Sequence, residues 1–244
     1  MIPGPKARRH LRILALCLAL GVAGAALVAL LLAGATPAWA PAAPAPDASA
    51  AETFEHAVVR QLTAVRDQDP SGTAPGGPAW ASMPWSVSLR DDDLRAWLSH
   101  RLEPWALNRD LLRAWPADVS RPLVVCDEGV IHVAVRLGGP DGRLAHFSCV
   151  PRIADDGSLW LSPTGAGVGR LRLPPQWVLR NDLIGRGADP QTTHLLECLR
   201  GEQPLADQAM IPLEGRRRVR ILDLSPHPGR LEVRCRTELA GPGG

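Results

Sequence analysis

The sequence predicts a domain of mixed α+β class, built on antiparallel sheet, that follows an apolar helix near the amino terminus. Three observations carry this prediction: an uncharged run of 23 residues (Ile13–Ala35), a strongly amphipathic helical stretch after Asp91, and two hairpins with period-two alternation. With 244 residues, of which 45% are hydrophobic, the chain is long enough for one ordinary domain with appendages.

The run Ile13–Ala35 predicts a transmembrane helix. As a helix it would be about 34 Å long, enough to cross a hydrocarbon core of about 30 Å. Residues 1–12 hold the basic side chains Lys6, Arg8, Arg9 and Arg12, and every acidic residue follows the run. The positive-inside rule therefore places this tail in the cytoplasm and the rest of the chain outside.

A cleaved signal peptide is the alternative for this segment. Ala38 and Ala40 form a small-x-small cleavage pattern, which would make the mature chain begin at Pro41. The apolar run is longer than a usual signal sequence, and proline directly after the cut is unfavourable, so we favour the retained helix. The sequence leaves both versions open.

Composition divides the rest of the chain. Residues 36–82 are rich in proline, alanine and glycine and predict an extended tether, interrupted by an amphipathic helix over about residues 52–66. The outer domain is expected over residues 83–239, followed by a flexible tail at 240–244. In that domain the stretch "DDDLRAWLSHRLEPW" spaces its leucines and two tryptophans along one face of a single helix, with Asp91 as N-cap.

Two hairpins frame the domain. Residues 130–137 and 143–150 flank "GGPDG", and pairing Leu137 with Arg143 sets Val133 opposite Phe147 on a wholly apolar face. The other face carries His132, Arg136, His146 and Ser148 and is expected to be wet. The second hairpin joins "RVRILDL" to "RLEVRCRTEL" through "SPHPG".

The stretch "GVGRLRLPPQWVL" (residues 167–179) predicts a strand with Arg170 and Arg172 outward and leucines inward. Pro174 and Pro175 end the strand, and a short apolar helix around Trp177 is expected to close the apolar face.

Four cysteines of the outer region (Cys126, Cys149, Cys198 and Cys235) have no metal-binding spacing. In an oxidising compartment they could form disulfides of any of three connectivities, or remain small buried apolar residues.

Charge and motifs exclude several functions. Outside the basic tail the chain has 23 basic and 25 acidic side chains, so the domain lacks the net positive charge that is typical of a nucleic-acid binder. No nucleophile elbow, phosphate loop, metalloprotease motif or flanked acidic pair is present, so we expect no enzyme, no cofactor and no metal site.

The basic tail, the single span, "DDDLRAWL", "VGRLRLP" and the final "GRLEVRCRTEL" together resemble the YpmS-like bacterial single-pass membrane proteins, which look like members of the tubular lipid-binding (TULIP-like) fold group. The resemblance covers residues 83–239 through loose motifs. Arg95 stands where the pattern leads us to expect a polar, asparagine-like residue. The resemblance implies a curved antiparallel sheet wrapped around or packed on a long helix, and an anchor in the bacterial cytoplasmic membrane.

The one-sided sheet and the resemblance lead to the expectation of a non-catalytic cell-envelope protein that binds lipid or another hydrophobic ligand. The candidate ligand-binding residues are Leu98, Val133, Phe147, Leu171, Leu173 and Trp177. The alternative is an envelope scaffold with a filled core. Its candidate contact with anionic headgroups or an acidic partner is the basic patch Arg216, Arg217, Arg218 and Arg220.

Overall fold

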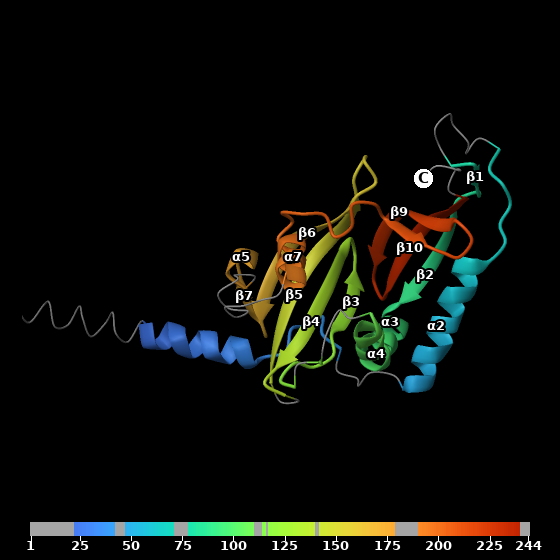
Figure 1. Ribbon diagram of the computed structural model, residues 1–244. Coiled ribbons are helices and arrows are strands. Elements are labelled where there is room, and N and C mark those ends of the chain that lie inside the picture. Colours follow the sequence, from blue (N-terminus) through green and yellow to red (C-terminus); the bar gives the residue numbers. More distant parts are fainter. Residues whose placement is uncertain are drawn as a thin grey trace, which may run out of the picture.

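The computed structural model describes residues 22–41, 47–70, 78–109, 114–115, 117–139, 142–178 and 190–239. These residues form two antiparallel five-stranded sheets with helices packed against them (Figure 1). The mixed α+β class with antiparallel sheet, which the sequence predicts, is confirmed.

The first sheet has the order β3-β4-β5-β6-β7. Its strands are β3 (Leu123–Asp127), β4 (Val130–Leu137), β5 (Arg143–Ile153), β6 (Leu159–Val168) and β7 (Leu171–Leu173). The predicted hairpin register is confirmed, because Leu137 pairs with Arg143 and Val133 with Phe147. This register follows from the period of two, since a one-residue slip would turn every apolar side chain to the other face.

The second sheet is centred on β10 (Arg230–Leu239) and β9 (Arg217–His227), with β8 (Met210–Pro212) beyond β9. Two short strands, β1 (Trp80–Ala81) and β2 (Trp85–Arg90), both pair with the other side of β10. The carboxy-terminal hairpin is confirmed, but its strands run through the predicted loop as far as His227. Gly229, at φ 79°, forms the tight turn that allows this.

The helices differ from the predicted ones in two places. The tether helix is α2 (Ala48–Thr63), capped by Asp47, whose carboxylate accepts a hydrogen bond from the Ala50 amide at 3.0 Å. Asp91 does not act as N-cap but begins the next helix, and the expected single long helix is two: α3 (Asp91–His100) and α4 (Leu102–Asn108). Pro104 explains the break, because it has no N–H to continue the backbone ladder.

The expected strand through "VGRLRLP" is also wrong. The chain turns back after Val168, and β7 pairs with β6 so that Leu171 lies opposite Val168. Gly169, at φ 58°, supplies the left-handed conformation that this two-residue turn requires. Arg170 therefore lies in a turn and not on the face of a strand.

Two apolar clusters form the core. In the first, helix α7 (Pro190–Leu199) places Leu196 against Phe147, Cys149 and Ala166 of the first sheet. The second lies on the other sheet around Val219, Val233 and Cys235, with Leu62 of α2 packed against it. The four cysteines of the outer region are all buried free thiols.

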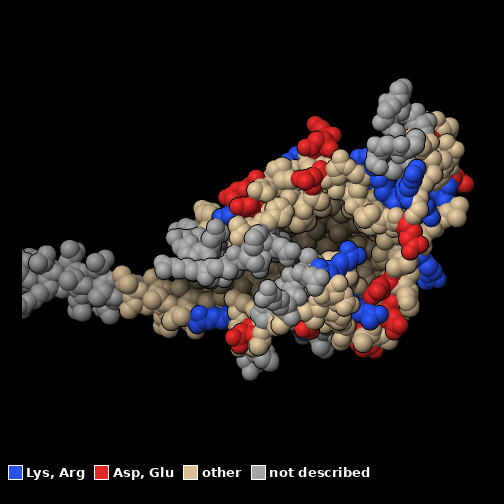
Figure 2. Space-filling model, in the orientation of Figure 1, with Lys and Arg blue, Asp and Glu red and all other residues tan. Residues whose placement is uncertain are grey.

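Hydrogen bonds among Asp91 of α3, Cys126 of β3 and Gly229 of the β9–β10 turn join the two sheets at one end. The amide of Asp91 donates to the carbonyl of Gly229 at 3.0 Å, while its carboxylate accepts from the Cys126 amide at 3.0 and 3.1 Å. Gly229 in turn donates to the carbonyl of Cys126, also at 3.0 Å. The face seen in Figure 2 is hollowed near its centre, in the area that lies between the sheets in Figure 1.

The predicted transmembrane run is described only in its second half. Residues 22–34 form a helix that projects from the first sheet (Figure 1), while residues 13–21 lie outside the described residues. Within the described part of the chain, no helix has the length and apolar character needed to cross a membrane.

Candidate functional site

Residues 35–41, here called the strap, connect the 22–34 helix to the first sheet. The last helical carbonyls point at the β6–β7 turn, where the Arg170 amide donates to the carbonyl of Leu32 at 2.7 Å and its Nε to that of Thr36 at 2.9 Å. The last carbonyls of a helix have no hydrogen-bond donors within the helix, and Arg170 supplies donors to them. It also places a cation at the negative end of the helix dipole. A Cβ at Gly169 would lie 2.4 Å from the carbonyl oxygen of Ala33, so the contact requires glycine there.

Trp39 fixes the strap to the sheet. Its ring stacks on His132 with centroids 4.7 Å apart and planes 12° apart, and it meets the edge of His146 at 5.5 Å. His132 Nδ1 and the Ser148 hydroxyl lie at 2.8 Å, a hydrogen bond whose direction depends on the histidine tautomer. The face expected to be wet is therefore partly covered, and Ser148 is only 8% exposed.

Burial disfavours the charged form of both histidines. It lowers the pKa of His132, against the opposing effect of Asp127. Burial also lowers the pKa of His146, assisted by the nearby His132 and Arg172 and opposed by a hydrogen bond with the backbone of Gly169. The two imidazole rings form the floor under Trp39.

Trp39 lines two pockets, and together with it they form what we call the Trp39 recess. The first, of about 380 Å³, is bounded by His132, His146, Ala166, Arg172, Leu173 and Pro175. The second, of about 320 Å³, lies between the strap and α3 and is bounded by Pro41, Arg90, Asp92, Arg95 and Val125. Val125 and His132 are paired in the sheet, so they share the covered face.

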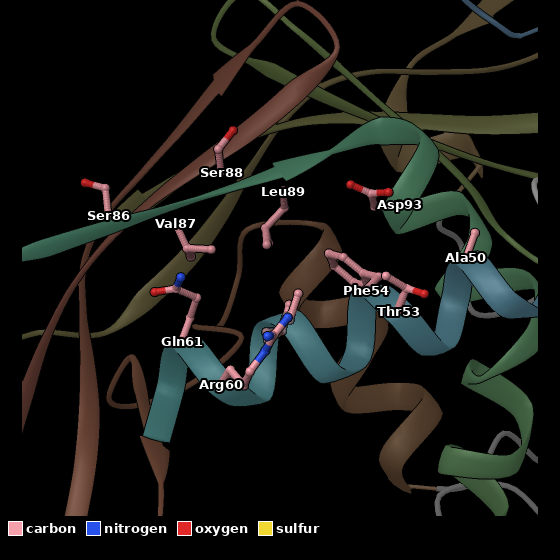
Figure 3. A pocket seen from close by; sticks show the side chains of 12 residues that line it. Ala50, Thr53, Phe54, Arg60, Gln61, Ser86, Val87, Ser88, Leu89 and Asp93 are labelled. Carbon is pink, nitrogen blue, oxygen red and sulfur yellow. The ribbon is translucent and has the colours of Figure 1, made fainter. Parts of the chain in front are cut away.

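A larger groove, of about 780 Å³, separates α2 from β2 (Figure 3). Val87 and Leu89 point from β2 toward the helix, and Phe54 and Gln61 line the opposite wall. Arg60 and Asp93 are its charged lining residues.

Backbone groups of β2 face this groove. The bond from the Asp91 amide to Gly229 sets the alternation of the antiparallel ladder, so the N–H and C=O of Ser86 and Ser88 point away from β10. Among the described residues β2 pairs with β10 alone. The groove therefore combines an apolar floor with an unpaired strand edge.

Four of the six predicted ligand-binding residues share one face of the first sheet, and this face is opposite the one that the Trp39 recess covers. Val133 and Phe147 lie opposite each other on the sheet face that α7 covers. Leu173 pairs with Ala166, which pairs with Phe147, so Leu173 lies on this same face, as does Leu171 two residues earlier in β7. Leu98 is half-buried on α3. The backbone of Trp177 belongs to α5 (Pro175–Val178), while its side chain lies outside what the structure describes.

The predicted basic patch is largely engaged within the chain. Arg218 and Arg220 form ion pairs with Glu238 at 3.0 and 2.8 Å, and Glu238 is only 3% exposed. Arg217 donates to the carbonyls of Thr63 and Ala64 at the end of α2. Arg216 is exposed. Most of these arginines therefore hold β9 to its neighbours.

Sequence reasoning missed Trp39 and Arg95 as site residues. A tryptophan isolated among small residues and prolines was the available signal for the first, since such a ring requires a surface to pack on. Arg95 gave no comparable signal, because its burial depends on the strap and β3. No group of three or more His, Cys, Asp or Glu side chains that could hold a metal ion occurs in the described ranges.

Comparison with known proteins adds no relative: no protein-family model matches the chain, and no curated protein matches it.

Proposed function

We propose that this chain is a membrane-anchored, non-catalytic protein of the bacterial cell envelope whose outer domain binds a lipid or another hydrophobic ligand in the Trp39 recess. The amino-terminal helix anchors it in the cytoplasmic membrane, with the basic tail inside and the domain outside. The curved sheet of a lipid-binding fold, which the sequence resemblance implies, is part of this proposal.

The position of Trp39 is the observation that carries the proposal. The apolar helix leads directly into the strap, and the strap holds a large aromatic ring over two pockets. Leu27, Leu30 and Leu31 of the helix are more than half exposed, as expected for side chains that face lipid. An acyl chain that leaves the bilayer along this helix would reach the recess first.

The lining suits an amphipathic ligand. Trp39, Val130 and Pro175 supply apolar surface, whereas the histidines and Ser148 supply polar groups nearby. Such a combination, mostly concave surface with a few polar groups, is typical of small-molecule sites.

A photoactivatable fatty acid added to membranes that contain the full chain would test the proposal. We expect crosslinks on peptides from β4, β6 and the strap, in addition to crosslinks on the helix. Gly165→Val should remove the β4 and β6 crosslinks, because the nearest atom to the new Cβ is at 3.9 Å and the side chain would fill the pocket. Ser162→Val, at an exposed position of the same strand, is the matched control. Crosslinks confined to the helix would refute the proposal.

A second candidate function, protein interaction, is favoured by the unpaired edge of β2. A groove between an edge strand and a helix suits an extended peptide that adds as a further strand. Ser88→Pro removes an N–H that faces the groove without touching the β10 ladder, so it should abolish crosslinking of a partner from this edge while the fold is retained. Equal crosslinking in the variant would exclude this mode of binding.

A further inference from the structure

Arg95 is a buried cation with too few partners. It lies in the second turn of α3, and the residue is only 8% exposed. A guanidinium has five N–H donors, and here one nitrogen, Nη2, donates to the carboxylate of Asp92. Nε and Nη1 are buried and have no hydrogen-bond partner. Because buried polar groups are nearly always paired in native proteins, this deficit requires an explanation.

A pocket next to Arg95 explains its unpaired donors. It is the part of the Trp39 recess between the strap and α3, with a volume of about 320 Å³. Trp39 and Pro41 form one wall and Val125 of β3 another, so the surroundings are apolar apart from the charged residues at the start of α3.

The charged residues that line the pocket are two arginines and two aspartates, and the unpaired polar groups among them are the donors of Arg95, which favour an anion. Arg90 and Arg95 both line it. The Asp91 carboxylate is already engaged by the Cys126 amide, at 3.0 and 3.1 Å. Asp92 is the only acid paired with Arg95 among the described residues, and its side chain is 56% exposed, so it can turn outward into water.

We propose that this pocket binds a phosphate or carboxylate group, for which Asp92 substitutes in the unliganded protein. The planar guanidinium of Arg95 matches the oxygens of either group, and Arg90 provides a second cation at the mouth. Resting on the function proposed above, the group is the head of a lipid whose apolar part lies beyond Trp39, in the pocket of about 380 Å³.

Two substitutions have opposite expected effects. Arg95→Met removes the donors and should weaken binding of an anionic ligand roughly tenfold or more. It should also leave the melting temperature of the ligand-free protein unchanged or higher, since an incompletely paired buried charge is replaced by an apolar side chain of similar length. Asp92→Asn removes the competing carboxylate and should tighten binding. Asp93→Asn is its matched control, because Asp93 is also in the first turn but lines the α2–β2 groove instead.

The test is thermal unfolding of the full chain in mild detergent with dihexanoyl phosphatidic acid, dihexanoylglycerol or inorganic phosphate. We expect phosphatidic acid to raise the melting temperature of the wild type and more so of Asp92→Asn, with Asp93→Asn like the wild type and little effect on Arg95→Met. If inorganic phosphate raises the melting temperature as much as phosphatidic acid does, the site binds a free anion. If phosphatidic acid raises it and inorganic phosphate does not, the site binds a lipid head group.

The anion site is overturned if phosphatidic acid stabilises Arg95→Met as much as the wild type, or if Asp92→Asn gains nothing over Asp93→Asn. Dihexanoylglycerol, which has no phosphate, shows whether the recess still binds lipid when the anion site is wrong. If it stabilises all variants equally, the recess binds the apolar part and only the head-group assignment is wrong. If Arg95→Met does not fold, Arg95→Lys keeps the charge without the planar donors and should still bind more weakly than the wild type.

Discussion

Trp39 stacks on His132 across 93 residues of sequence, with ring centroids 4.7 Å apart and planes 12° apart. This contact joins the segment after the amino-terminal helix to the middle of the first sheet. It also turns a sheet face that would otherwise meet water into the floor of a recess. The strap therefore forms one wall of the recess.

Acidification should loosen the strap. The pKa values of His132 and His146 lie below the ordinary value of 6.5 in the folded protein because burial disfavours their charged forms. Their contribution to stability is therefore complete above pH 6.5 and is lost as the pH falls through the lowered values. Hydrogen exchange of residues 35–41, corrected for intrinsic rates, should show less protection at pH 5 than at pH 7.5.

The controls separate these histidines from others. His132→Phe with His146→Phe should weaken the pH effect while keeping rings under Trp39. His56→Phe, at an exposed position on α2, should leave it unchanged. Protection that does not vary between pH 5 and pH 7.5 in the wild type would contradict the prediction.

Gly169→Ala should detach the strap. Alanine at φ 58° costs about 1–2 kcal/mol by itself, and its Cβ would also lie 2.4 Å from the Ala33 carbonyl and 2.6 Å from that of Leu32. Gly229→Ala carries a similar backbone cost at φ 79°, but nothing lies within 4 Å of its Cβ. Limited proteolysis should cut residues 35–41 faster in Gly169→Ala than in Gly229→Ala, and equal rates would argue against the docking.

Glu238 should be a stability determinant of the second sheet. It is 3% exposed and pairs with Arg218 and Arg220, so Glu238→Ala leaves two partly buried cations without their acceptor. We expect a loss of about 3 kcal/mol in the free energy of unfolding, measured by urea denaturation. Glu232→Ala removes a 44% exposed carboxylate from the same strand and should change stability by no more than about 0.5 kcal/mol. Similar losses for both variants would refute a special role for Glu238.

Local pattern was enough to predict β4 and β5 with their register. Alternation fixed which residues face inward, and a Gly-rich turn between the strands fixed the pairing of Val133 with Phe147. The break between α3 and α4 is local too, and Pro104 could have indicated it. The two-residue turn at Gly169 was harder to predict, because Gly165, Ala166 and Gly167 shortly precede it and each of them could have been the turn.

The recess could not be predicted because its contacts are distant in sequence. Arg170 reaches Thr36 across 134 residues, and neither periodicity nor composition indicates that a Pro/Ala-rich segment docks there. The same holds for Arg95, which a helix-face argument places beside Leu98 but whose burial depends on β3 and the strap. Amphipathic patterns identify which face is covered, not what covers it.

The buried thiols should resist modification in the native protein. Burial raises the pKa of Cys149 and Cys235 to about 11, and that of Cys126 to about 12 with a further contribution from Asp91. At pH 8 the thiolate fraction of Cys149 is then roughly a hundredfold lower than for an ordinary thiol, and the thiolate is the reactive form. Iodoacetamide should therefore label these three cysteines only after denaturation, as measured by peptide mass spectrometry without reduction.

Because the structure has free thiols at Cys126, Cys149, Cys198 and Cys235, the same spectra should contain no disulfide-linked peptides among them. Rapid labelling of the native protein, or a linked pair of these peptides, would show that the interior is more open or more oxidised than the structure indicates.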